Sequence, residues 1–266
     1  SASNGSGDAT LLLITGGSPT ITNLTVDGTG GAKHGIQVYG AAAALSNITA
    51  RKNAGYGVLV NHSAVTATEL VTSDNGWGGV NVDARGAGSA SFTMESGNLG
   101  EDASVVIEGQ AGDQTATTIN GGTMQNVVKH PDAASSAGED TITIDGATTI
   151  TGDVLGDIVT VNGGDIGGNV TGNQSLLVNG GDIGGSVSPA YQVTYTKGTD
   201  VEVAGLGGSY AKGQKVTFTA TANTGFELGT GSVRVVTASG TTLPVTRYNS
   251  GECAFTMPAE DVNVTV

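Results

Sequence analysis

The chain of 266 residues contains 45 glycines and only 5 prolines, and its net charge at neutral pH is −14. Clustered Lys and Arg carry the binding of nucleic acids and anionic membranes, so this excess of acidic residues argues against both as partners. Glycine, threonine and valine are abundant and strong helix formers are few, so we expect an all-β protein.

Membrane-spanning and targeting segments are not evident. No stretch reaches the ~18 apolar residues that a spanning helix needs, so we expect no membrane insertion by this fragment. Residues 1–10 are predicted to be a flexible lead-in, and no basic segment followed by an apolar one opens the chain. We therefore expect any secretion signal or surface anchor to lie in segments absent from this chain.

A repeat begins after a first apolar strand, which we place at residues 11–15. Pairs of apolar residues two positions apart recur, most often at intervals of 22 residues. Such pairs are expected where alternate strand residues point to opposite faces and one face is interior. One ladder consists of Ile36/Val38, Val58/Val60, Val80/Val82 and Val105/Ile107. A second consists of Leu24/Val26, Ile48/Ala50, Leu70/Thr72 and Phe92/Met94.

Two strands in each repeat predict a coil. Stacked coils would pair their strands in parallel about 4.8 Å apart and bury an apolar column that no single coil could bury alone. Gly35, Gly57 and Gly79 occupy the same place in three coils. We expect the backbone to turn sharply there, into the second strand of the coil.

The regular coils are predicted to be interrupted once. Residues 127–140 contain Pro, Ser and acidic side chains, which predict a loop projecting from the coil. Beyond it the repeat shortens to 17 residues, because the segment Val161–Gly168 recurs unchanged as Val178–Gly185. The interior column is then continued by Ile150, Ile166 and Ile183.

The ladder segments resemble a known architecture. Gly35-Ile36-Gln37-Val38 and its counterparts starting at Gly57 and Gly79 are similar to coils of the right-handed parallel β-helix, the pectin-lyase-like fold. The resemblance covers roughly residues 11–189. It implies a right-handed parallel β-helix (solenoid) in an all-β chain. Alternating apolar residues in the segments that follow predict a small, mostly antiparallel β domain after it.

The composition changes after Pro189, which marks a second domain at residues 190–266. Of the 11 aromatic residues, 7 lie there, and the repeat ends. The segments Gly213–Ala220, Gly225–Leu228 and Phe255–Val264 resemble the divergent internalin B-repeat family of bacterial surface proteins. That resemblance implies an extracellular spacer or adhesive stalk unit.

Aligned coils place the loops at residues 27–34, 51–56 and 73–78 side by side. Loops of stacked repeats often form the binding face, and Tyr and Trp rings can lie flat against sugar rings. We predict a glycan-binding surface centred on Tyr56 and Trp77. Its other members are predicted to be His34, Arg51, Lys52, Asn53, Asp74 and Asn75.

Catalysis is the alternative for the same loops. A glycosidase needs two carboxylates across the sugar, and a lyase needs a base near a Ca²⁺ ion that several acids hold. Asp74 with Glu95 or Asp27 could supply the pair, and Lys52 or Arg51 the base. In loops this polar such pairs arise by chance, so a binding role is favoured over an enzyme.

Asp165 and Asp182 occupy the same position in two successive short repeats, so they should lie about one strand spacing apart. Two stacked carboxylates repel unless a cation or proton lies between them, which permits a calcium site. Exposure to solvent is the simpler interpretation. No other cofactor is expected.

Three functions therefore remain open. The first is an extracellular, cell-surface adhesin-like protein that binds host or environmental glycans, or surface proteins, on the side of the β-helix. The second is a polysaccharide lyase or glycoside hydrolase of the pectin-lyase-like fold. The third is a structural stalk or spacer.

Overall fold

The computed structural model describes residues 9–86, 88–100, 103–109, 112–130, 139–229, 231–248 and 251–266. The chain divides into two compact units. The first comprises Ser1–Ser175 and Gly180–Ser186, and the second comprises Leu176–Asn179 and Val187–Val266. Both are built from strands, which confirms the predicted all-β class.

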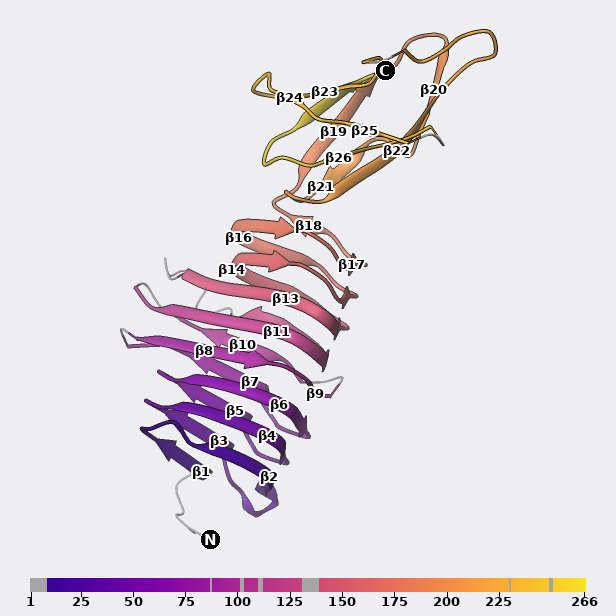
Figure 1. Cartoon of the computed structure of the whole chain (residues 1–266). Coiled ribbons are helices and arrows are strands. Elements are labelled where there is room, and N and C mark those ends of the chain that lie inside the picture. The colour runs from indigo at the N-terminus through magenta and orange to yellow at the C-terminus, as the bar shows by residue number, and fades with distance from the viewer. Residues whose placement is uncertain are drawn as a thin grey trace. The chain divides into compact units, whose positions relative to one another are not determined.

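The first unit is a β-solenoid whose strands pair in parallel, as predicted (Figure 1). One ladder runs through β1 (Thr10–Thr15), β3 (His34–Tyr39), β5 (Tyr56–Asn61), β7 (Gly78–Asp83), β10 (Val105–Glu108), β12 (Val127–Lys129) and β14 (Val154–Val161). The other runs through β2 (Thr20–Asp27), β4 (Ala42–Arg51), β6 (Ala64–Ser73), β8 (Ser89–Met94), β11 (Gln114–Met124) and β13 (Glu139–Ile150). The remaining elements up to residue 188 are η1 (Gly28–Gly30), β9 (Gly97–Asn98), β15 (Asp165–Ile166), β16 (Val170–Val178), β17 (Asp182–Ile183) and β18 (Val187–Ser188).

The first ladder has the register that the repeat predicts. Ile36 pairs with Val58 and Val58 with Val80, and all three are fully buried. Each fully buried Val or Ile side chain contributes about 1.5–3 kcal/mol of hydrophobic stabilisation. The core of the solenoid is therefore this column of stacked aliphatic side chains.

The second ladder differs from the prediction at its fourth coil. Leu24, Ile48 and Leu70 are in register as expected, but Phe92 pairs with Val65 and Gly97 lies opposite Leu70. The reason is a longer connection, because β8 begins six residues after β7 ends whereas β6 begins three residues after β5 ends. The second strand of each early coil also bends at a left-handed residue, such as Asn47 (φ 53°) or Glu69 (φ 54°), with apolar residues on both sides of the bend. Periodicity alone could not decide which side Phe92 joins.

Two of the three aligned glycines, Gly35 and Gly57, are needed for close approach rather than for a sharp turn. A Cβ atom at Gly57 would lie 2.9 Å from the carbonyl oxygen of Gly79, and one at Gly35 would lie 2.6 Å from that of Gly57. Contacts under 3.0 Å require a neighbour to move. A side chain at these positions would therefore push neighbouring coils apart.

The prediction of a loop at residues 127–140 is wrong at both ends of that range. Val127–Lys129 forms strand β12, which pairs with β10 and β14, and β13 begins at Glu139. Residues 131–138 of the predicted loop lie outside the described part of the chain. The strand escaped prediction because its third residue is a lysine, which is buried only because it meets two carboxylates.

The shorter coils keep the column with fewer residues. Ile150, Ile166 and Ile183 pair in register, as predicted. Residues 154–155 of β14 pair with β12, and residues 158–161 pair with β13. A single strand therefore continues both ladders, which accounts for the 17-residue repeat.

The second unit contains two small sheets. Its strands are β19 (Tyr191–Thr196), β20 (Val201–Ala204), β21 (Gly208–Tyr210), β22 (Lys215–Ala222), β23 (Arg234–Thr237), β24 (Thr242–Leu243), β25 (Thr246–Arg247), β26 (Glu252–Thr256) and β27 (Val262–Thr265). Their orders are β21-β19-β27-β23-β24 and β20-β22-β26-β25, and pairing is antiparallel except between β19 and β27.

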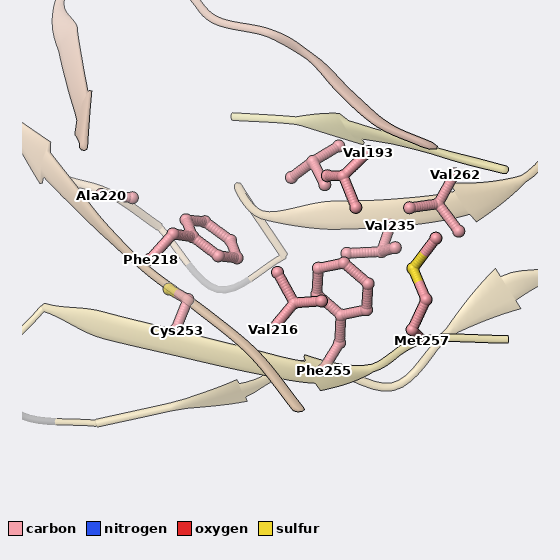
Figure 2. Close-up of a cluster of buried hydrophobic side chains, with 10 residues drawn as sticks. Val193, Val216, Phe218, Ala220, Val235, Cys253, Phe255, Met257 and Val262 are labelled. Carbon is pink, nitrogen blue, oxygen red and sulfur yellow. The ribbon is translucent and has the colours of Figure 1, made fainter. Parts of the chain in front are cut away.

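Side chains from both sheets meet in one core, which Figure 2 shows. Val193, Val235 and Val262 come from the five-stranded sheet. Phe218 and Phe255 come from the four-stranded sheet, and their rings meet edge to face with centroids 6.5 Å apart. Cys253 is a fully buried free thiol in the same core.

Candidate functional site

The structure brings the three predicted loops together at one edge of the solenoid. Asp27 pairs with Arg51 and Arg51 with Ser73, at the ends of β2, β4 and β6. Tyr56 pairs with Gly78 at the starts of β5 and β7. Loop residues that are 22 or 24 positions apart in sequence therefore become neighbours in successive coils.

Three aromatic rings form a cluster at this edge, which we call the aromatic cluster (His34, Tyr56 and Trp77). The rings of His34 and Tyr56 are stacked, with centroids 5.9 Å apart and planes 8° apart. The Trp77 ring is roughly perpendicular to both, with its centroid 5.6 Å from that of His34 and 5.7 Å from that of Tyr56. The ammonium of Lys33 lies over the Trp77 ring, 5.1 Å from its centroid.

The rings differ sharply in exposure. Trp77 is 56% exposed, whereas His34 and Tyr56 are each only 7% exposed. The Nδ1 atom of His34 accepts a hydrogen bond from the backbone N–H of Tyr56, at 3.1 Å, which fixes its ring. His34 and Tyr56 therefore form a support, and Trp77 is the ring of the cluster that solvent reaches.

A glycine makes room for this support. A Cβ atom at Gly55 would lie 2.6 Å from the Cε1 atom of His34 and 2.7 Å from the carbonyl oxygen of Lys33. The stacked position of His34 thus depends on the absence of a side chain one coil later.

Asn53 and Asn75 form a stacked amide pair between coils. The backbone N–H and the Nδ2 group of Asn53 both donate to Oδ1 of Asn75, at 3.1 and 2.8 Å. Nδ2 of Asn75 in turn donates to the carbonyl oxygen of Ala50, at 3.0 Å. Because Asn53 is only 2% exposed, these amides hold the loops in place rather than face solvent.

The charged residues predicted for the site lie at its exposed rim. Arg51 pairs with Asp27 through Nε and Oδ2, 2.9 Å apart. Hydrogen bonds from Thr29, with a smaller contribution from Arg51, lower the pKa of Asp27 to about 2. Lys52 and Asp74 are exposed and both have left-handed backbones with φ of 55°.

A polar network that the sequence reasoning missed adjoins Tyr56. Arg85 contacts both Asp83 and Glu108, with nitrogen–oxygen distances of 2.8 Å to each. Asn81 donates to Oε1 of Glu108 at 3.0 Å. Burial and the negative charge of Glu108 raise the pKa of Tyr56 to about 12.

A signal for this network was present in the sequence. Tyr39, Asn61, Asp83 and Glu108 each follow the second apolar residue of a first-ladder pair, and they pair in register. The position that follows each apolar pair therefore predicts a row of these polar side chains along the solenoid.

Asp165 and Asp182 pair in register on the two-residue strands β15 and β17, and both are exposed. Ca²⁺ takes six to eight oxygen ligands, more than these two carboxylates supply. Among the residues that the structure describes, no group of three or more His, Cys, Asp or Glu side chains is arranged to hold a metal ion.

A groove lies at the opposite end of the first-ladder strands. Small side chains of successive coils line much of it. His62 also lines it, and its ring lies 6.0 Å from the exposed ring of Tyr39 between centroids. These lining side chains include Ala42, Ala64, Ser91 and Ala116, which pair in register.

Within the described ranges, no helix is long and apolar enough to cross a membrane.

The second unit matches a known family. Residues 191–266 match the family model of the divergent InlB B-repeat domain. This match confirms the resemblance predicted for the C-terminal domain and does not extend into the solenoid. No curated protein and no solved structure matches the chain. The pectin-lyase-like resemblance of the solenoid stays a prediction.

Proposed function

We propose that this is an extracellular, adhesin-like protein of the bacterial cell surface that binds glycans on the side of its solenoid. The observation that carries the proposal is the exposed ring of Trp77, held by two buried rings. An exposed indole ring suits the apolar face of a sugar ring. Its rigid support lowers the conformational entropy lost on binding.

The surroundings of Trp77 suit a polar ligand. Lys33 lies against the ring, and Lys52 and Asp74 lie on neighbouring exposed loops. A ligand that stacks on Trp77 would therefore find hydrogen-bond donors and acceptors within one or two coils. Aromatic contact combined with peripheral polar contacts is the usual composition of a small-ligand site.

The carboxylates of the polar network favour binding over catalysis. Asp83 and Glu108 both pair with Arg85, and Glu108 also accepts from Asn81. A glycosidase needs one carboxyl group that donates a proton and a second that attacks or activates water. Two carboxylates that share one guanidinium are poorly suited to either role.

The proposed location is supported by the second unit. Its family model is that of the divergent InlB B-repeat domain, which occurs in bacterial surface proteins. A solenoid that presents a binding surface, joined to such a module, suits a protein displayed outside the cell. Partners would then be host or environmental glycans.

A glycan array probed with the labelled full chain tests the proposal. Glycans that bind are then incubated with the protein and assayed for new reducing ends and for unsaturated products. Binding without products supports the proposal. Products from a bound polysaccharide would replace it with the lyase or hydrolase alternative, and no binding at all would replace it with the stalk.

A further inference from the structure

Lys129 lies in the interior of the solenoid between two carboxylates that the proposed function does not use. It is on β12, Asp140 is on β13 and Asp157 is on β14. The side chains are 2%, 0% and 6% exposed, respectively. Nζ of Lys129 lies 2.8 Å from Oδ2 of Asp140 and 2.7 Å from Oδ2 of Asp157.

The two carboxylates contact the ammonium in different ways. Lys129 donates a hydrogen bond to Oδ2 of Asp157. Its contact with Asp140 has the distance of an ion pair without hydrogen-bond geometry, and no donor in the described part of the chain bonds to that Oδ2 atom. The other oxygen, Oδ1, accepts from the hydroxyl of Thr115 at 2.7 Å.

This arrangement is costly as a set of charges. One ammonium and two carboxylates carry a net charge of −1 in a site that excludes water, and buried charges are expensive even when paired. An arrangement that removed two of these charges would be favoured by the same burial. The neighbouring amine and carboxyl group can form such an arrangement, because their condensation gives a neutral amide.

We propose that Lys129 and Asp140 condense to an intramolecular isopeptide bond between Nζ and Cγ. The amine and the carboxyl group are already in contact, which supplies the proximity that an uncatalysed condensation in water lacks. Exclusion of water from the site favours the amide over its hydrolysis. This inference is independent of glycan binding.

The step balances without an oxidant or a cofactor. Nζ passes a proton to Asp157 along their hydrogen bond, and its lone pair attacks Cγ of Asp140. The C–Oδ2 bond then breaks, and two of the three original Nζ protons leave with Oδ2 as water, one of them returned by Asp157. Asp157 ends as the carboxylate that it was at the start.

Each carboxyl oxygen of Asp140 has a place in this account. Oδ1 becomes the amide oxygen and keeps its hydrogen bond from Thr115. Oδ2, which lacks a hydrogen bond within the described residues, is the atom that departs. Asp157 acts as the proton carrier because it alone of the pair holds Lys129 by a hydrogen bond.

Mass spectrometry of the denatured full chain tests the proposal on the unmodified protein. The expected mass is lower than the sequence mass by one water. Protease digestion is expected to release a branched peptide that joins the segment containing Lys129 to the one containing Asp140. A chain with the full sequence mass would overturn the proposal.

Variants identify the residues. Asp157→Asn should retain its full calculated mass, whereas Asp165→Asn, which changes an exposed carboxylate of the same unit, should still lose one water. Complete cross-linking in Asp157→Asn would overturn the role of Asp157 as proton carrier. A lost water that maps to Asp145-Gly146 and is regained in mild alkali would be a succinimide and would overturn the isopeptide bond.

Discussion

The rings of Trp77 and Tyr56 are nearly perpendicular, with centroids 5.7 Å apart and planes 79° apart, although 21 positions separate the two residues in the sequence. The stacking of coils creates this contact, because Tyr56 begins β5 and Trp77 directly precedes β7. Trp77 is thus held by the regular part of the solenoid while its ring stays exposed.

Removing the exposed ring should abolish most of the glycan affinity and leave the fold intact. Central aromatic residues of binding sites typically contribute about 2 kcal/mol or more, so Trp77→Ala should weaken binding roughly 30-fold or more. Titration calorimetry with an array-selected glycan measures the loss. Tyr39→Ala is the matched control, because Tyr39 is equally exposed but lies at the groove. Equal losses in both variants would contradict the assignment.

Disturbing the support should weaken binding without touching the ligand. In Gly55→Ala the new methyl group would clash with His34 and displace the stacked rings. We expect glycan binding to fall as in Trp77→Ala, and the melting temperature to fall as well, because the methyl group would also lie 2.7 Å from the backbone carbonyl oxygen of Lys33. Binding is therefore compared at a temperature at which circular dichroism shows both proteins to be folded. Ala54→Ser changes the preceding exposed residue and should bind normally. Normal binding by Gly55→Ala would show that the support is not needed.

Tyr56 should make the solenoid sensitive to alkali. Its pKa is raised from 10.0 to about 12, so the folded state disfavours the tyrosinate relative to the unfolded chain. The resulting stability is complete below pH 10 and is lost as the pH rises towards 12. Denaturant unfolding at several pH values should show a steeper decline for the wild-type protein than for Tyr56→Phe. Parallel declines would mean that Tyr56 is not the responsible group.

The burial of Phe92 in the second ladder can be tested directly. Phe92 is fully buried opposite Val65, and replacing a buried Phe by Ala costs about 3–5 kcal/mol. Phe92→Ala should lower the free energy of unfolding of the solenoid by that amount. Val71→Ala, at a 40% exposed position of β6, should cost less than about 1 kcal/mol. Similar costs for both would contradict the burial of Phe92.

The repeat itself was predictable from the sequence because a parallel coil leaves a direct mark. Ile36, Val58 and Val80 align by sequence spacing and pair as that spacing predicts. The spacing does not predict the pairing where connection lengths change, as at Phe92, because both halves of a bent strand carry the same alternation. Nor does it predict the strand at Lys129, because a charged residue inside a column is explained only by partners on other strands.

The sequence predicts which residues gather at the candidate site better than it predicts what each of them does there. Sequence spacing alone brought His34, Tyr56 and Trp77 to one edge. Burial of His34 and Tyr56 beneath neighbouring loops depends on side-chain direction, which spacing does not reveal. The network of Arg85 was missed because its partners, Asp83 and Glu108, come from different coils and an arginine at a turn looks exposed.

The single tryptophan of the chain permits the most direct test of the central claim. Because Trp77 is that residue, all tryptophan fluorescence reports on the proposed site. Titration with a glycan that the array selects should give a saturable change in emission, with the same dissociation constant as calorimetry. A glycan that binds by calorimetry and leaves the emission unchanged would contradict the proposal that Trp77 contacts it.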